Sequence, residues 1–172
     1  MTSEDILSFW FLPADVPGHG QPRMVWFRKD AGFDEEIRTR FLPDVEAALN
    51  GERADWADTP QGALALLILL DQFPRNLFRG EARAFAGDAQ ALRVADAVIA
   101  RGWDQAMSGV ERAFVYLPFE HSEALADQTR SMELFGALAS QLPETAGYLD
   151  YAHKHQEVIA RFGRFPHRNA AL

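Results

Sequence analysis

The chain of 172 residues has the length of one domain with its own hydrophobic core, so we expect residues 1–172 to form a single helical domain. Its 17 basic residues against 25 acidic ones give a net charge of -8, which disfavours general attraction to nucleic acid or to an anionic membrane surface. The absence of cysteine excludes disulfides, thiolate catalysis and cysteine-bound metals, and it favours a cytoplasmic protein over a secreted one.

The apolar pattern indicates neither a membrane span nor a targeting segment. The longest apolar run, Ala63–Leu70, is far shorter than the ~20 residues that a helix needs to cross a bilayer. At the N-terminus, Glu4 and Asp5 stand where a signal peptide would carry basic residues. We therefore expect neither a membrane nor nucleic acid as a partner.

Apolar residues recur at helical spacing in the first part of the chain. An opening helix is predicted after Ser3 and is expected to end before Pro13. A second helix is predicted from Asp34 to the stop at Gly51, because acidic residues favour a helix N-terminus. No segment anywhere alternates apolar and polar residues for long enough to indicate a strand, so the pattern predicts an all-α fold.

The middle of the chain carries the most apolar of the predicted helices. Thr59 is expected to cap this helix, with Pro60 at its first helical position. Proline inside a helix removes a backbone donor and bends the axis. We therefore expect the helix to continue, kinked at Pro74, as far as Gly80.

Further helix boundaries are visible in the second half. A helix is predicted over residues 88–101. Ser108 and Glu111 have the spacing of a capping box and start a short helix, which Pro118 is expected to interrupt. Ser122 is then expected to cap a longer helix that reaches Leu142.

The last helix is predicted over residues 144–162, with Gly163 as the residue that ends it. The connections between successive predicted helices are short. Short connections favour antiparallel packing of neighbouring helices, so we expect an antiparallel helical bundle or array.

A first group of polar residues follows the apolar helix directly. Asp71, Arg75 and Arg79 are spaced i, i+4 and i+8, which places a carboxylate and two guanidinium groups on one helix face. One interpretation is an ion pair on a solvated surface, which contributes little to stability. The other is partial burial, in which case the arginines need partners.

A second group surrounds Pro118. Glu120 and His121 stand just before the helix that Ser122 is expected to cap, where free backbone N–H groups attract a negative ligand. A glutamate beside a histidine is suited to general acid/base chemistry or to metal binding. The alternative is that both side chains only satisfy other groups inside the fold.

A third group follows the last helix, in a segment where basic residues alternate with aromatics. The polar members of this segment are Arg161, Arg164, His167, Arg168 and Asn169. Arginine offers paired donors that suit a carboxylate or a phosphate. The segment therefore forms either an anion site or a set of buried partners for Asp71 and Glu120, and both interpretations predict that the three groups lie close together.

Three separated runs, taken together, resemble the bacterial DUF924 family. They are Leu69–Gly80, Tyr116–Glu123 followed by Gln128, and His155 followed by Ile159–Asn169. The resemblance implies a tetratricopeptide-like helical fold and brings with it no known reaction. The polar positions of the family's motifs map onto Asp71, Gln72, Arg75, Asn76, Arg79, Glu120, His121, Ser122, Gln128, His155, Arg161, Arg164, His167, Arg168 and Asn169.

Three hypotheses for these residues stay open. The first is a ligand-binding helical domain, whose arginines receive a small anionic ligand or a peptide carboxylate. The second is an enzyme with Glu120 or Asp71 as the base, a histidine as the acid, and arginines that stabilise developing negative charge. The third is a structural protein in which the polar residues form a buried network that docks the helices.

Missing motifs disfavour several other classes. No glycine-rich phosphate loop and no Gly-x-Ser-x-Gly elbow is present, so we expect no cofactor and no serine hydrolase chemistry. Asp71, Glu120 and the histidines lack a compact metal-ligand pattern, so we expect no metal. The aromatic loop over residues 26–33 is a candidate contact for a homodimer.

Overall fold

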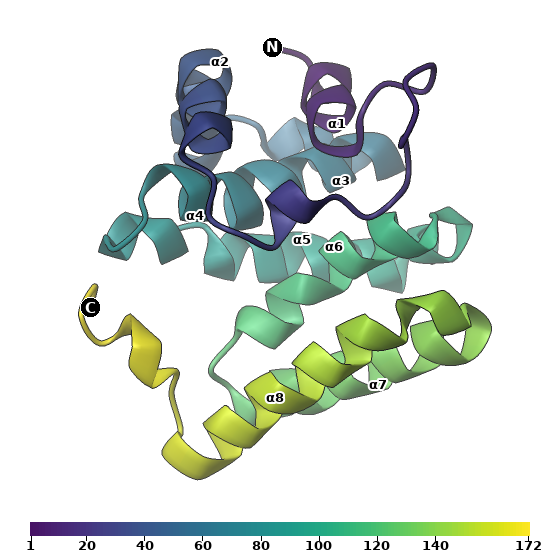
Figure 1. Ribbon diagram of the computed structural model, residues 1–172, viewed down its shortest axis with the longest axis vertical. Helices are drawn as coiled ribbons and strands as arrows, with labels where there is room; N and C mark the ends of the chain where they lie inside the picture. The colour runs from purple at the N-terminus through teal and green to yellow at the C-terminus, as the bar shows by residue number, and fades with distance from the viewer.

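The computed structural model describes residues 1–172 and consists of helices and their connections, with no strand (Figure 1). This confirms the all-α fold. The α-helices are α1 (Ser3–Phe11), α2 (Ala31–Leu49), α3 (Pro60–Leu67), α4 (Phe73–Leu77), α5 (Asp88–Ala100), α6 (Gly109–His121), α7 (Leu125–Gln141) and α8 (Ala146–Phe162). Tetratricopeptide-like geometry within this array stays a prediction.

The helices form two groups that meet at α6. Helices α1 to α5 pack together on one side, whereas α7 and α8 form an antiparallel hairpin on the other (Figure 1). Helix α6 contacts α3 and α5 as well as α7 and α8. No helix combines the length and the apolar character that crossing a membrane requires. The C-terminal segment leaves α8 and turns back toward α4 (Figure 1).

Side-chain caps start four of the eight α-helices, namely α1, α2, α3 and α6. Thr59 caps α3, and Ser108 forms a capping box with Glu111 at the start of α6, as predicted. Two starts lie earlier than predicted. Thr2 rather than Ser3 caps α1, and α2 begins after Asp30, whose carboxylate accepts the N–H of Phe33 at 2.9 Å.

The long apolar helix does not simply kink at Pro74, and it ends before Gly80. It widens into a π-helical turn over Ile68–Gln72, in which the N–H of Phe73 donates to the carbonyl of Ile68. Pro74 has no N–H to offer the carbonyl of Leu70, and its ring excludes that carbonyl from the α-helical position. The wider turn resolves this conflict. Asp71 lies within the turn and is buried.

The prediction of a helix break at Pro118 was wrong. Helix α6 continues through Pro118 to His121, and α7 starts only at Leu125, with Ala124 rather than Ser122 at the cap position. Pro118 is itself buried in α6, so tertiary packing outweighs the loss of one backbone hydrogen bond. Glu120 and His121 therefore stand at the C-terminal end of α6 and not before a helix N-terminus.

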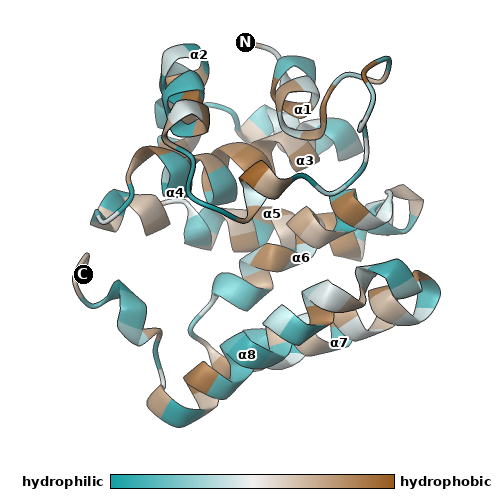
Figure 2. Ribbon diagram, in the orientation of Figure 1, coloured by the Kyte–Doolittle hydropathy of each residue, from teal (hydrophilic) through white to brown (hydrophobic).

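An aromatic core holds the two groups of helices together. Trp10 of α1 is fully buried, with its ring edge-to-face against Phe114 of α6 at 5.4 Å and stacked on Trp26 at 5.8 Å. Trp26 belongs to a short turn, Met24–Trp26, that precedes α2. Apolar residues concentrate on α3, on this turn and on α6 (Figure 2). The core therefore fixes the turn against α6.

The π-helical turn packs closely against Gly87, which lies just before α5. A Cβ atom at Gly87 would lie 2.1 Å from the carbonyl oxygen of Leu70, which is backbone and cannot rotate away. We expect Gly87→Ala to lower the free energy of unfolding by about 2 kcal/mol, because the turn must shift. Chemical denaturation measures this.

Gly136 of α7 is the matched control, because a Cβ there meets nothing within 4 Å. Gly136→Ala is expected to raise stability by roughly 0.5–1 kcal/mol through helix propensity. Equal effects of the two substitutions would contradict the close packing of Gly87 on Leu70.

Candidate functional site

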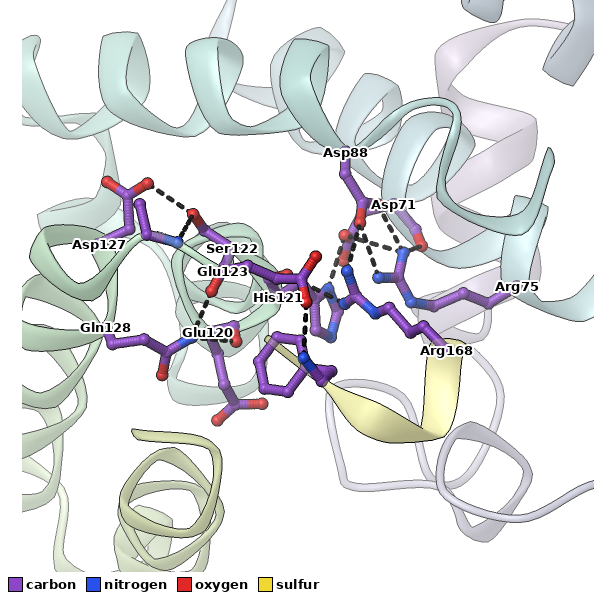
Figure 3. A network of polar contacts seen from close by, with 12 residues as sticks. Asp71, Arg75, Asp88, Glu120, His121, Ser122, Glu123, Asp127, Gln128 and Arg168 are labelled. Atoms are coloured by element: carbon purple, nitrogen blue, oxygen red, sulfur yellow. Dashed lines mark hydrogen bonds and ion pairs between the residues drawn. The ribbon is translucent and has the colours of Figure 1, made fainter. Parts of the chain in front are cut away.

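A buried carboxylate, Asp71, organises the polar residues of the π-helical turn (Figure 3). Asp71 is 1% exposed. Its Oδ1 accepts a hydrogen bond from Nδ1 of His121 at 2.7 Å, and its Oδ2 accepts one from Nε2 of Gln72 at 2.9 Å. Nη1 of Arg75 lies 3.4 Å from Oδ1. The carboxylate is thus satisfied from the ends of two helices.

Arg75 is held rigidly beside Asp71. Its Nη1 donates to the carbonyl oxygen of Asp71 at 2.8 Å. Its Nη1 and Nη2 also donate to the two carboxylate oxygens of Asp88, at 2.8 and 3.0 Å. Asp88 opens α5, so this bidentate pair ties α5 to the π-helical turn.

Both members of the Asp71–Arg75 pair are charged. Burial by itself would raise the pKa of Asp71, but the neighbouring His121 and Arg75 hold it below its usual value. Burial likewise disfavours the charge on Arg75, yet Asp71 and Asp88 raise its pKa above the ordinary range. The pair is therefore an ionised, hydrogen-bonded unit inside the fold.

Arg168 brings the C-terminal segment to this unit. It is buried, its Nη2 donates to the carbonyl oxygen of His121 at 2.9 Å, and its Nη1 lies 3.8 Å from Asp88. Its guanidinium packs on the rings of Phe85 and Phe165 at 4.5 and 4.6 Å. We call Asp71, Arg75, Asp88, His121 and Arg168 the Asp71 cluster.

The backbone also anchors the C-terminal segment. The N–H of Phe165 donates to the carboxylate of Glu123 at 2.6 Å, and the Phe165 ring is buried. The expected proximity of the three polar groups is therefore met through Arg168. Its partners are Asp88 and a backbone carbonyl, rather than Asp71 or Glu120.

An aromatic-walled cavity of about 260 Å³ adjoins the Asp71 cluster, and we call it the aromatic cavity. It opens between the Met24–Trp26 turn, α6 and α8. Its lining residues are Trp26, Phe27, Gln72, Arg75, Phe114, Leu117, Glu120, His121, Tyr148, Tyr151 and His155.

Glu120 is the least satisfied residue of the aromatic cavity. It is 3% exposed, and its Oε1 has no hydrogen-bond partner. Nδ1 of His155 lies 3.7 Å from Oε2, beyond hydrogen-bond distance, and instead donates to the carbonyl of Tyr151 at 2.8 Å. The Glu120 carboxyl points away from the Asp71 cluster (Figure 3). The hydroxyl of Tyr148, in the same cavity, also lacks a partner.

The surroundings keep Glu120 and His155 neutral near pH 7. Burial, reinforced by the negative charge of Asp71, raises the pKa of Glu120 to about 8. Burial also lowers the pKa of His155. A carboxyl group in its acid form can donate one hydrogen bond as well as accept others.

Several other predicted site residues have structural partners. Gln128 is buried and donates to the carbonyl oxygens of Glu120 and Ser122, at 2.7 and 2.6 Å, which secures the end of α6. The hydroxyl of Ser122 donates to Asp127 at 2.6 Å. Arg79 lies away from the Asp71 cluster, because its Nε and Nη2 donate to the carboxylate of Asp34 of α2, at 2.7 and 3.2 Å.

The C-terminal segment places its remaining polar residues outside the aromatic cavity. Arg161, Arg164 and Asn169 are exposed and line neither the cavity nor the Asp71 cluster. His167 is also exposed, with its ring 5.6 Å from that of Phe165. The turn after Gly163 folds Phe165 and Arg168 inward, so their neighbours in sequence face outward.

Sequence reasoning missed part of the site. Asp88 was interpreted only as the start of a helix, and nothing in its local pattern signals an ion pair with Arg75. Tyr148, Tyr151 and His155 follow one another at i, i+3 and i+7, so helical spacing does indicate their common face. Trp26 and Phe114 were not predicted as cavity walls, because their proximity depends on long-range packing.

The arrangement has the parts for proton transfer or for holding an oxygen-rich ligand. His121 donates through Nδ1 to Asp71, which leaves Nε2 of this cavity-lining ring as an acceptor in the neutral form. Glu120 in its acid form is a donor. No group of three or more His, Asp or Glu side chains has a metal-binding arrangement.

The raised pKa of Glu120 implies that the stability of the protein depends on pH. Its folded-state pKa of about 8 lies above the ordinary value of 4.5, so the folded state holds its proton longer than the unfolded state. Stability from this group is complete below pH ~4.5 and is lost as the pH rises toward ~8. Glu120→Gln should therefore gain stability relative to the wild type over this range, by roughly 3 kcal/mol at its upper end.

Denaturant unfolding of both proteins at a series of pH values measures this difference. Glu157→Gln provides a control, because this carboxyl is exposed on α8 and has no ion pair. A constant offset between the wild type and Glu120→Gln across the series would show that Glu120 titrates normally.

Two arginines of the C-terminal segment, Arg168 and Arg164, are expected to differ in how much they contribute to stability. Arg168→Ala removes a buried guanidinium from a carbonyl, a carboxylate and two rings, so we expect a loss of about 2 kcal/mol in unfolding free energy. Arg164→Ala changes an exposed side chain and is expected to stay within ~0.5 kcal/mol of the wild type. Thermal denaturation compares them, and a larger loss in Arg164→Ala would refute this placement.

Comparisons with known proteins agree with this architecture. The sequence profile of a family described as "Bacterial protein of unknown function (DUF924)" matches residues 6–172. A solved structure of a protein of unknown function from Agrobacterium tumefaciens is similar with a TM-score of 0.85 and 41% identity, over 98% of this chain and 88% of that one. No curated protein matches. The chain therefore belongs to the DUF924 family.

Proposed function

We propose that the aromatic cavity binds a small organic anion. The observation that carries this proposal is the pair of buried polar groups, Glu120 Oε1 and the hydroxyl of Tyr148, that line one cavity and have no partner in the protein. Buried polar groups are nearly always hydrogen-bonded, so two unpartnered ones in one cavity point to a ligand. A neutral Glu120 and a tyrosine hydroxyl can both donate, so they suit an oxygen-bearing group of the ligand.

The size and walls of the aromatic cavity favour a metabolite over a peptide. Its volume of about 260 Å³ lies just below the ~300–1,000 Å³ typical of sites for drug-sized ligands. Trp26, Phe114 and Tyr148 present aromatic surface, which suits a flat apolar group. Of the arginines predicted to receive the anion, Arg75 is the one that lines the cavity.

An enzyme is the second candidate, because the hydrogen bond between His121 and Asp71 supports it. The carboxylate at 2.7 Å fixes the proton on Nδ1, and Nε2 is then the basic nitrogen. Glu120, with its pKa of about 8, would be the acid on the same cavity wall. A base and an acid beside one cavity suit proton transfer to and from a bound molecule.

The cellular setting and the assembly are part of this proposal. The lack of cysteine supports a cytoplasmic protein. In the aromatic loop over residues 26–33, Phe33 is buried and Trp26 packs on Trp10, whereas Phe27 is exposed. Homodimer contact through this loop stays a prediction that rests on Phe27.

A panel of ligands tests the binding proposal through the melting temperature. We expect an organic acid or a phosphorylated metabolite, rather than an acidic peptide or a divalent metal, to stabilise the protein. At a ligand concentration about 100 times Kd the gain is ~2.7 kcal/mol, or roughly 5–10 °C for a chain of this size. Leu117→Trp should fill the aromatic cavity and abolish the shift, whereas Arg164→Ala should keep it.

A shift that persists in Leu117→Trp would place the ligand elsewhere and overturn the proposal. His121→Gln then separates binding from catalysis. Under binding alone it keeps the thermal shift and no product forms with either protein. Under catalysis it keeps the shift but loses turnover of the stabilising compound.

A further inference from the structure

A second hollow, of about 220 Å³, adjoins the aromatic cavity and is lined by cations. We call it the basic hollow; its polar lining residues are Arg28, Lys29, Gln72, Arg75, Asn76 and Arg79. No acidic residue lines it, although the whole chain has a net charge of -8. Cations that share one hollow repel one another, and a bound anion relieves that repulsion.

The basic hollow and the aromatic cavity lie side by side. Trp26, Phe27, Gln72 and Arg75 line both of them. One ligand of metabolite size can therefore place an apolar group in the cavity and a charged group in the hollow.

Two cations of the basic hollow are engaged within the protein and two are free. Arg75 is paired with Asp88, and Arg79 is paired with Asp34. Arg28 and Lys29 are exposed, with no ion pair or side-chain hydrogen bond. The paired arginines shape the hollow, whereas Arg28 and Lys29 keep donors available for an anion.

The chain that carries Arg28 and Lys29 is fixed at both ends. On one side, Nε1 of Trp26 donates to the carbonyl of Trp10 at 3.1 Å, and the two indoles stack. On the other side, Asp30 caps α2. This anchoring holds the two cations at the basic hollow, so that a ligand does not need to order a long loop.

We propose that the basic hollow is the anion subsite of the aromatic cavity, and that the ligand is a planar organic acid, with its ring in the cavity and its carboxylate or phosphate between Arg28 and Lys29. This inference rests on the proposed function, and it supplies the substrate class. The anion is therefore received by a loop before α2, and not by Arg161 and Arg164, which the sequence indicated.

The test compares the binding of charged and neutral probes to two variants, one substituted in the basic hollow and one substituted outside it. Benzoate and phenyl phosphate are the anionic probes, and benzamide is the neutral one. Chemical-shift titration follows the indole N–H signal of Trp26, which lines both spaces. The variants are Arg28→Gln/Lys29→Gln and, with the same change in charge at an exposed place outside both spaces, Arg161→Gln/Arg164→Gln.

We expect Arg28→Gln/Lys29→Gln to weaken both anionic probes by roughly three- to tenfold, with the larger loss for phenyl phosphate because it carries more charge. Benzamide binding should change by less than about twofold, and added salt should reduce the difference between probes. Arg161→Gln/Arg164→Gln should leave all three probes unaffected. The relative affinity of benzoate and phenyl phosphate then identifies whether the subsite prefers a carboxylate or a phosphate.

Two outcomes overturn the subsite and leave the proposed function standing. One is that all three probes bind the wild type and Arg28→Gln/Lys29→Gln equally. The other is that Arg161→Gln/Arg164→Gln weakens the anions as strongly, since net charge would then explain the effect. If no probe moves the Trp26 signal, the aromatic cavity admits no planar ligand, and the proposed function fails together with the inference.

Discussion

The buried charge of Asp71 is the constraint on which the site depends. An ionised carboxylate is stable inside a fold only with opposite charge and hydrogen bonds around it. His121 at the end of α6, Gln72 and Arg75 supply these, and Arg75 in turn requires Asp88 of α5. Satisfying one carboxylate therefore fixes how α4, α5 and α6 meet. The π-helical turn before Pro74 is the backbone feature that turns Asp71 toward these partners.

Asp71 also affects the chemistry of its neighbour Glu120. Burial is the main cause of the raised pKa of Glu120, and the negative charge of Asp71 raises it further. Asp71 has Arg75 and the hydrogen bond from His121 and keeps its charge, whereas Glu120 has no such partners and keeps its proton up to a pKa of about 8. Unequal partners thus give adjacent carboxyl groups different protonation states, which is the condition for donating to one group and accepting from another.

The sequence predicted the helices better than it predicted the site. Caps at Thr59 and Ser108 and the stop at Gly163 depend on a few adjacent residues, so local pattern located them. Pro118 misled the prediction, because packing around α6 outweighs local preference. The pattern placed Asp71 and Arg75 in one group and His121 in a second that was expected to lie nearby, but it did not indicate the partner Asp88 or the aromatic walls. Those contacts join residues far apart in sequence, which no local pattern encodes.

The distribution of satisfied and unsatisfied groups argues against a purely structural network. The Asp71 cluster docks helices, and nearly every charge in it has a partner. Glu120 Oε1 and the hydroxyl of Tyr148 join no helices together, since both residues line the aromatic cavity and these atoms have no hydrogen-bond partner. A buried carboxyl group with a raised pKa lowers stability at neutral pH, and an apolar residue there would avoid that cost. The stability of the fold therefore gives no reason for a carboxyl group at Glu120, which agrees with the proposed ligand site.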